Sequence, residues 1–338
     1  NFKTTVQSNG DRQVLEHGVT LIASGAEEFK TDDYLYGQDQ RVLTGLELQK
    51  KILNGDGFDS CGTAVFVQCV GSRIPRRPYC SKVCCTQSIK SALSLKANNP
   101  AMDIFVLYRD LRSYGFREAL YRQARDRGIK FIRYDNEKEL AVRSAENGLE
   151  IAFSDRVLRR QMAISGDLLV LASAVVPEKS NPLAQMYKVS QNDDGFFAEA
   201  HVKLRPNDFA TDGVFVCGLA HAPKPIEESI SQAQAAASRA VTVLAALEVS
   251  VSGTVAVVDP NCCSSCGVCV EICPYSAPQF IANTGKAEIQ ATLCKGCGLC
   301  VASCRSGALH LKGFDTGQIM AQLKTCLFDA APAETTFS

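Results

Sequence analysis

The stretch from Asp259 to Pro274 reads DPNCCSSCGVCVEICP, and the stretch from Leu293 to Arg305 reads LCKGCGLCVASCR. A shift of 31 positions superimposes the cysteines of the first stretch on those of the second. The chain therefore contains an internal repeat of the pattern C-x2-C-x2-C-x3-C. The first copy holds Cys263, Cys266, Cys269 and Cys273, and the second holds Cys294, Cys297, Cys300 and Cys304.

This spacing is typical of bacterial-type ferredoxins, in which it binds two 4Fe–4S clusters. Three thiolates on a tight loop can each reach a different iron, and Gly267 or Gly298 lets the backbone fold around the cluster. The fourth cysteine of each run begins a helix that leads to the other cluster. Zinc is a weaker alternative, because structural zinc sites take four ligands and not an interleaved eight. We therefore predict two ligand sets: Cys263, Cys266, Cys269 and Cys304, and Cys294, Cys297, Cys300 and Cys273.

The overall composition excludes several classes of partner. The chain has 338 residues, of which 46% are hydrophobic, and it carries 36 basic and 36 acidic side chains. Its length allows two or three domains. A net charge of zero gives no net electrostatic attraction to nucleic acid or anionic lipid. The longest apolar run, Leu168 to Val176, is too short to cross a bilayer, and no signal peptide opens the chain. We expect no direct membrane insertion, so any membrane contact would be made through partners.

The cysteine content indicates the compartment. Sixteen cysteines in a chain of this length, many at gaps of two or three residues, are more typical of metal ligands in a reducing compartment than of disulfides. We therefore expect a cytoplasmic protein.

Three apolar, β-branched stretches predict strands: HGVTLIASGA at 17–26, GDLLVLASAVVP at 166–177 and TDGVFVCGLA at 211–220. Pro225 then opens a long alanine-rich helix with Glu227 and Glu228 in its first turn, which suits a helix N-terminus. By themselves these features fit an ordinary strand–helix unit of an α/β domain as well as they fit a cofactor site.

The arrangement resembles the two-dinucleotide flavoproteins of the thioredoxin-reductase and glutathione-reductase kind. In those proteins a strand ending in ATG lies by the FAD, and a GVFAAGD strand places the next helix N-terminus against the flavin ring. Such a helix end can stabilise negative charge at the flavin N1–C2=O edge. The resemblance implies FAD contacts by Ser24, Gly25, Gly218, Leu219, Ala220, Pro225 and Ile226.

The chain departs from this family at two points. Leu219 stands where the family usually has the aspartate that holds the ribityl chain, and no G-x-G-x-x-G motif occurs anywhere in the chain. We therefore expect a flavoprotein core that lacks its N-terminal portion. Either the chain is a C-terminal fragment, or another polypeptide supplies the ADP half of the FAD site.

The stretch from Gln68 to Lys90, QCVGSRIPRRPYCSKVCCTQSIK, holds four more cysteines. It joins a predicted strand at 63–69 to a predicted helix at 79–96. A strand at 103–108, a helix at 116–127 and a strand at 129–133 follow, which completes a βαβαβ unit with a parallel sheet. The first strand–helix turn of such a unit usually carries a glycine fingerprint for a dinucleotide pyrophosphate. Here cysteines and a bulky turn replace the fingerprint, so we expect no nicotinamide site.

Spacing alone leaves two interpretations of Cys69, Cys80, Cys84 and Cys85. They could hold a third 4Fe–4S cluster, although adjacent ligands such as Cys84 and Cys85 are sterically awkward. Alternatively, Cys80, Cys84 and Cys85 could form a redox-active group that exchanges with a disulfide substrate.

Taken together, these motifs resemble the A subunit of heterodisulfide reductase and related subunits of quinone-interacting and other bifurcating complexes. The resemblance covers nearly the whole chain, including GVTLIASGAEEF, CVGSR…YCSKVCC, YRDLRSYG, VFVCGLA and the terminal cysteine repeat. It implies that Cys69, Cys80, Cys84 and Cys85 hold a third 4Fe–4S cluster beside the flavin. It also implies that Lys90 lies close to the flavin N5, where an ammonium can tune the flavin potentials. Without the family, Lys90 would be an ordinary solvated residue.

The predicted fold is α/β, with an incomplete two-dinucleotide-binding, thioredoxin-reductase-like flavoprotein core followed by an α+β ferredoxin domain for two clusters. We predict a split FAD-binding domain at 1–57 and 156–250 and a nucleotide-domain-like insert with a cluster at 58–155. A ferredoxin domain at 251–313 and a tail at 314–338 follow. The expected cofactors are FAD and three 4Fe–4S clusters.

The resemblance implies an oxidoreductase subunit that passes electrons between FAD and the clusters, and we hypothesise flavin-based electron bifurcation. The implied partners are other redox subunits: heterodisulfide reductase B- or C-like subunits, or hydrogenase-, formate dehydrogenase- or quinone-linked ones. Two alternatives stay open. One is a wiring subunit that carries clusters without a functional flavin, and the other is a thiol–disulfide oxidoreductase that uses Cys80, Cys84 and Cys85.

Overall fold

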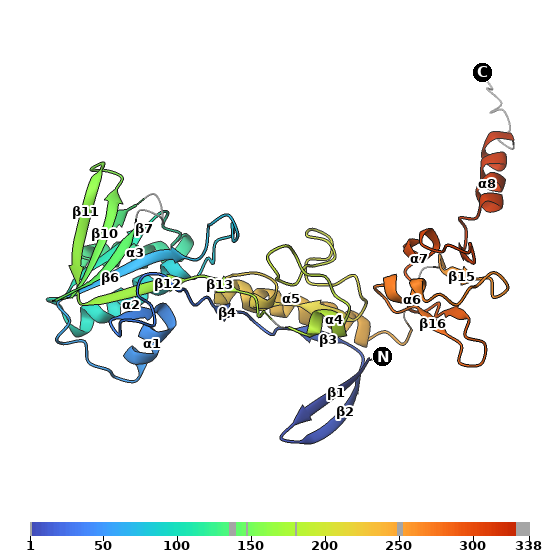
Figure 1. The fold of residues 1–338 in the computed structure, drawn as a ribbon, viewed down its shortest axis with the longest axis horizontal. Coiled ribbons are helices and arrows are strands. Elements are labelled where there is room, and N and C mark those ends of the chain that lie inside the picture. Colours follow the sequence, from blue (N-terminus) through green and yellow to red (C-terminus); the bar gives the residue numbers. More distant parts are fainter. Residues whose placement is uncertain (1, 135–139, 147, 180, 249–252, 329–338) are drawn as a thin grey trace, which may run out of the picture. The chain divides into compact units, whose positions relative to one another are not determined.

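Figure 1 shows the computed structural model, which describes residues 2–134, 140–146, 148–179, 181–248 and 253–328. The chain forms two compact units, one made of Asn1–Pro182 and Ser190–Ala240 and the other of Leu183–Val189 and Val241–Ser338. The predicted boundary between residues 250 and 251 and the end of the predicted tail, 329–338, lie outside the described residues. Within the described ranges, no helix has the length and apolar character needed to cross a bilayer.

The first unit is organised around a sheet of five parallel strands in the order β5-β12-β6-β7-β8. Three of these strands alternate with two helices along the chain, which confirms the predicted βαβαβ unit. The elements are β5 (Val42–Thr44), α1 (Gly45–Leu53), β6 (Thr63–Val70), α2 (Cys84–Asn98), β7 (Asp103–Tyr108), α3 (Glu118–Asp126), β8 (Lys130–Arg133) and β12 (Leu168–Ser173).

Side chains of β6 alternate between the two faces of this sheet, as the two-residue period of a strand requires. Ala64 and Phe66 pack with apolar side chains of α1, α2 and α3 on one face. Val65 and Val67 pack on the other face with the central strand of an antiparallel sheet of order β11-β10-β9. Both faces are therefore covered, which accounts for the nearly continuous apolar strands. The bounds are β9 (Ala141–Ala145), β10 (Gly148–Asp155) and β11 (Arg160–Gly166).

The position of β12 corrects one prediction. We placed 166–177 with the FAD-binding part, inside the range 156–250, but β12 pairs in parallel with both β5 and β6 inside the five-stranded sheet. All six of its residues are buried. A continuous apolar run is common to all buried parallel strands, so the pattern could not tell which sheet β12 joins. β5 and α1, predicted within 1–57, also belong to this sheet and its helical layer.

Helix α2 begins at Cys84 and not at residue 79. Lys82 has a positive φ of 58°, a left-handed conformation that does not continue into a right-handed helix. The residues before Cys84 therefore form a turn at the end of β6, and the two adjacent cysteines open the helix.

The rest of the first unit consists of short strand pairs and one long helix. β3 (Thr20–Ile22) pairs in parallel with β14 (Val214–Val216), and β4 (Glu27–Glu28) pairs antiparallel with β13 (Val175–Val176). The predicted alanine-rich helix is α5 (Ile226–Leu244). A hairpin that we did not predict, made of strands β1 and β2, precedes β3. The bounds of the hairpin strands are β1 (Phe2–Ser8) and β2 (Asp11–His17), and the short helix α4 (Leu183–Met186) belongs to the second unit.

The second unit contains the cysteine repeat, and the 31-residue offset applies to its backbone as well. β15, α6 and β16 of the first copy begin 31 residues before β17, α7 and β18 of the second. The strands pair across the copies, β15 with β18 and β16 with β17. Each small sheet therefore has one strand from each copy. The bounds are β15 (Ala256–Val258), α6 (Val268–Ile272), β16 (Pro278–Phe280), β17 (Ala287–Ile289), α7 (Leu299–Ala302), β18 (Leu309–Leu311) and α8 (Thr316–Phe328).

Candidate metal and cofactor sites

The eight cysteines of the repeat separate into two groups of four. Each group lines its own cavity and contains three cysteines from one copy and one from the other. The grouping is the one that the repeat predicts, and it follows from the strand pairing across the copies. The cavities are lined by Cys263, Cys266, Cys269 and Cys304 in one case and by Cys273, Cys294, Cys297 and Cys300 in the other.

Two glycines shape the loops that carry these cysteines. Gly267 and Gly298 stand immediately before α6 and α7 with φ values of 81° and 77°. Glycine adopts this left-handed conformation without the steric penalty of a side chain. The chain can therefore turn sharply enough for the three thiols of each loop to face one cavity.

The donor set of each cavity suits a cluster. Four thiolates are the ligands of a 4Fe–4S cluster, and each thiolate reaches a different iron. In the part of the chain that the structure describes, no group of three or more His, Cys, Asp or Glu side chains converges as it would around a single metal ion. The residues present fit two clusters of this type, while iron ligation itself stays a prediction.

A third group of thiols, Cys69, Cys80, Cys84 and Cys85, lies at the carboxyl edge of the five-stranded sheet. Cys69 stands near the end of β6 with a positive φ of 64°, and Cys84 and Cys85 open α2 and pack against Ala172 of β12. Cys69 and Cys80 are close enough to influence the pKa of Cys84. Open α/β sheets bind their cofactors at this edge, so the thiols occupy the place that a dinucleotide phosphate usually takes.

Cys84 and Cys85 share a hydrogen bond in a buried setting, with exposed fractions of 7% and 3%. This hydrogen bond and burial raise the pKa of Cys84 well above that of an ordinary thiol, whereas the same bond lowers the pKa of Cys85 to about 7. A thiolate can ligate a metal or attack a disulfide, but reactive cysteines are partly exposed. Of the four thiols only Cys80 is not buried, which favours the cluster over the thiol-exchange interpretation.

Arginine side chains surround this group. Arg109 donates hydrogen bonds to the carbonyls of Ser72 at 2.7 Å and Arg73 at 3.2 Å. Burial raises the pKa of Cys69, and the charges of Arg109 and Arg73 oppose that rise. Positive charge at this position would stabilise the thiolates of a bound cluster.

The predicted FAD contacts gather at the edge of the β3–β14 pair. The N–H of Cys217 donates to the carbonyl of Ile22 at 3.1 Å, so Ser24 and Gly25 follow β3 where the turn at 218–220 follows β14. Gly218 has a φ of 71°, and no atom lies within 4 Å of the position that a Cβ would take. The turn therefore borders open space, as a backbone that approaches a cofactor does.

The start of α5 lies at the same edge. The Gln232 side chain in α5 accepts a hydrogen bond from the N–H of Gly218 at 3.0 Å, which ties the helix to the turn. Pro225 is buried, and Ile226 directly after it is 75% exposed. An exposed apolar side chain beside a free glycine turn suits the flat apolar ring of a flavin. The residues present fit one side of a flavin site, and FAD binding stays a prediction.

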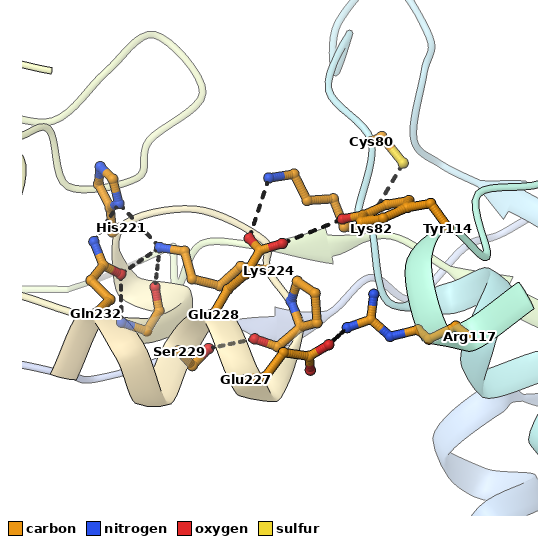
Figure 2. Close-up of polar contacts among 12 residues, drawn as sticks. Cys80, Lys82, Tyr114, Arg117, His221, Lys224, Glu227, Glu228, Ser229 and Gln232 are labelled. Carbon is orange, nitrogen blue, oxygen red and sulfur yellow. Dashed lines mark hydrogen bonds and ion pairs between the residues drawn. The ribbon is translucent and has the colours of Figure 1, made fainter. Parts of the chain in front are cut away.

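The first turn of α5 also reaches the cysteine-bearing loop, as Figure 2 shows. Glu227 forms an ion pair with Arg117 just before α3, and Glu228 forms one with Lys82 at 3.8 Å. The backbone N–H of Lys82 donates to the sulfur of Cys80 at 3.3 Å. One ion pair, between Lys82 and Glu228, therefore connects the helix predicted to face the flavin with the loop predicted to hold the third cluster. The other connects this helix to the start of α3.

A buried lysine that the sequence did not reveal lies behind the turn at 218–220. The ammonium of Lys224, which is 8% exposed, donates to the Gly218 carbonyl at 2.9 Å, to Gln232 Oε1 at 2.6 Å and to His221 Nδ1 at 3.1 Å. His221 Nε2 lies 2.8 Å from Glu199. Burial, with a smaller effect of Lys82, lowers the pKa of Lys224 from 10.5 to about 8. The available sequence signal was a lysine between two prolines, just before the helix predicted to face the flavin.

The structure places Lys90 on α2, five positions after Cys85, with its side chain exposed. Five residues are about one and a half helical turns. The implied proximity of Lys90 to the flavin N5 stays a prediction.

Replacing Lys224 with methionine is expected to flatten the dependence of stability on pH between about 8 and 10.5. A lysine whose folded pKa is lowered binds its proton less tightly than in the unfolded chain, so the free energy of unfolding rises as pH increases through this window. The rise is up to about 3 kcal/mol, at about 1.4 kcal/mol per pKa unit. Denaturant unfolding of the wild type and of Lys224→Met at pH 7.5 and pH 10 measures this rise. The same change in the free energy of unfolding between the two pH values in both proteins would contradict the prediction.

Comparisons with known proteins concern the cysteine repeat and the chain as a whole. Residues 256–305 match the family described as a 4Fe-4S dicluster domain. The chain is 38% identical over 291 residues to the CoB--CoM heterodisulfide reductase iron-sulfur A subunit numbered 2 of Methanopyrus kandleri, a match that covers 80% of this chain and 44% of that protein. It is 36% identical over 335 residues to the A subunit of the H(2):CoB-CoM heterodisulfide,ferredoxin reductase of Methanothermobacter marburgensis, covering 94% and 50%. The chain thus spans about half the length of these curated relatives.

The fold of the chain has a counterpart among solved structures. Thioredoxin reductase of T. acidophilum superimposes on 72% of this chain and 70% of its own chain, with a TM-score of 0.51 and 11% identity. This likeness concerns the fold alone. It confirms the predicted thioredoxin-reductase-like architecture.

Proposed function

This chain is a homologue of the A subunits of heterodisulfide reductases over most of its own length, and from that premise we propose that it is an iron–sulfur flavoprotein subunit for electron transfer. The observation that carries the proposal is the gathering of twelve of its sixteen cysteines into three groups of four. Four thiolates are the usual ligand set of a 4Fe–4S cluster. The proposed cofactors are therefore three such clusters and FAD.

The contacts of α5 support a role for FAD next to the third cluster. FAD, when bound, accepts electrons in pairs and can release them singly, chemistry that no side chain supplies. This chain would hold it with the turn at 218–220 and the start of α5, while Glu228 and Lys82 keep that helix against the Cys80 loop. This ion pair links the two proposed redox centres through side chains of α5 and the Cys80 loop.

We further propose that the chain takes part in flavin-based electron bifurcation. The name of the M. marburgensis relative contains two electron acceptors, a heterodisulfide and ferredoxin. This chain offers two kinds of exit for single electrons, one at the Cys80 loop in the first unit and one in the cysteine repeat of the second. Both relatives are A subunits by name, which supports other subunits as partners. The partners proposed here are heterodisulfide reductase B- or C-like subunits, or hydrogenase-, formate dehydrogenase- or quinone-linked ones.

Two other functions make different predictions. A wiring subunit would carry the clusters without functional flavin, and Leu219 together with the absence of a G-x-G-x-x-G motif favours it. A thiol–disulfide oxidoreductase would use Cys80, Cys84 and Cys85, and the lowered pKa of Cys85 favours it, although burial of Cys84 and Cys85 opposes access by a disulfide.

The native complex is expected to contain about twelve iron atoms and one FAD per copy of this chain, the content of three 4Fe–4S clusters and one flavin. Iron analysis and flavin release, with the co-purifying subunits identified, measure this content. About eight iron atoms would support thiol exchange at the Cys80 loop, and full iron without flavin would support the wiring subunit.

For bifurcation, rapid reduction of the complex should reduce low-potential and high-potential clusters together. Reduction of one class of cluster alone would contradict bifurcation.

A further inference from the structure

The ammonium of Lys224 has all of its protons engaged. Lysine has three N–H donors and no acceptor, and the three acceptors are the Gly218 carbonyl, Gln232 Oε1 and His221 Nδ1. The ammonium is therefore held behind the turn at 218–220 and makes no direct contact on the open side of Gly218. Figure 2 shows these bonds converging on the ammonium.

The neighbours of Lys224 are arranged to keep it charged. Gln232 Nε2 also donates to His221 Nδ1, at 2.9 Å, so this ring nitrogen is an acceptor and the imidazole carries its proton on Nε2. That N–H faces the Glu199 carboxylate at 2.8 Å. A neutral histidine with this tautomer directs its lone pair at the ammonium, whereas a protonated one would repel it.

From this geometry we infer that Lys224 is a positioning residue that places one fixed positive charge behind the flavin-facing turn and thereby favours reduced over oxidised FAD. The inference rests on the FAD site of the proposed function and deepens it. Uptake of two electrons from a partner redox protein and one proton from solvent leaves reduced FAD with one additional negative charge. In a water-poor site the attraction between such a charge and a buried ammonium is strong.

Other charged groups also act on the ammonium. The groups that face Lys224 from the neighbouring elements are Lys82 on the cysteine-bearing loop, Glu228 on α5, Cys217 at the end of β14, and Glu199. Lys82 is already paired with Glu228. The charge of Lys224 is thus the one held directly behind the Gly218 carbonyl.

The test is the midpoint potential of bound FAD in the intact complex, measured by spectroelectrochemical titration. Lys224→Met is expected to shift the equilibrium toward oxidised FAD at least tenfold, which is about 30 mV for a two-electron couple. Lys224→Arg keeps the charge and is expected to keep most of the potential. Lys203→Met removes a charge from an exposed position and serves as the matched control, with no shift expected.

The wild-type protein provides a second measurement, which does not depend on the folding of Lys224→Met. Between pH 7 and 9.5 its FAD potential is expected to fall more steeply once Lys224 loses its proton, and the steeper fall should be absent from Lys224→Arg. Normal FAD content with the same potential in Lys224→Met as in wild type overturns the role of Lys224 and leaves the proposed function intact. A wild-type complex without FAD overturns both.

Discussion

Replacing Cys84 with alanine is expected to lower the iron content of the complex from about twelve to about eight atoms per chain, because one of the four proposed ligands of the third cluster is lost. Cys84 is 7% exposed and packs with Cys85 and Ala172, so water or a distant side chain has little access to replace the thiolate. Iron analysis together with electron paramagnetic resonance of the reduced protein measures the loss of this cluster. The signals of the other two clusters should persist.

Cys61→Ala is the matched control for this substitution. Cys61 is buried to a similar degree, at 8% exposure, and stands just before β6, at the opposite end of that strand from Cys69. Its removal should leave iron near twelve atoms per chain. Wild-type iron content in Cys84→Ala would mean that these thiols do not hold a cluster, and the thiol-exchange interpretation would take its place.

Replacing Gly296 with alanine is expected to destabilise the second unit by about 3 kcal/mol or more. Gly296 has a φ of 63°, and an added Cβ would lie 2.4 Å from the carbonyl oxygen of Thr254. Left-handed strain costs about 1–2 kcal/mol, and the collision with a backbone atom adds to it, because a backbone atom cannot rotate away. Denaturant unfolding followed by circular dichroism and by cluster absorbance measures the loss.

Gly298→Ala separates the two causes. Gly298 also has a positive φ, of 77°, but nothing lies within 4 Å of its Cβ position, so strain alone should cost about 1–2 kcal/mol. Ser265, the counterpart of Gly296 in the first copy, has a φ of 57° and carries a side chain, which shows that the backbone conformation by itself is tolerated. Equal stability of the two alanine variants would refute the collision with Thr254.

The second unit was the most predictable part of the chain. The cysteine spacing predicted the division into two sets of four, and the structure extends the same offset to the strands and helices. Ligand spacing is a local constraint, so a short motif contains most of the information. The β1–β2 hairpin was predictable in the same way, since Asn9-Gly10 between two strands is a strong hairpin signal, but we did not use it.

The first unit was predictable only in its local order. The βαβαβ succession follows from alternating apolar runs and helical spacing, and the structure has it. The partner of β12 depends on contacts between segments more than 90 residues apart, as between Leu169 and Val65, and no local pattern encodes that choice. The three antiparallel strands β9, β10 and β11 were also missed, although Leu149, Ile151 and Phe153 alternate at full burial.

The candidate sites also differ in how far local sequence predicts them. Cysteines can be recognised as candidate ligands from their residue type and spacing, so the membership of all three groups was predictable from the sequence. The network around Lys224 was not, because it joins side chains at positions 199, 221, 224 and 232 whose meeting depends on how the turn at 218–220 packs on α5. An ordinary lysine, histidine or glutamine has no spacing rule that would mark it beforehand.

Because the two copies of the repeat exchange strands, each copy depends on the other for a complete structure. Cutting the chain between the copies would leave β15 and β16 without the edges that complete them and would leave each iron centre one sulfur short. Neither copy by itself would therefore keep complete sheets or a complete set of four thiols. The two copies differ at side chains that leave the strand exchange intact, such as Pro274 in one copy and Arg305 at the same place in the other.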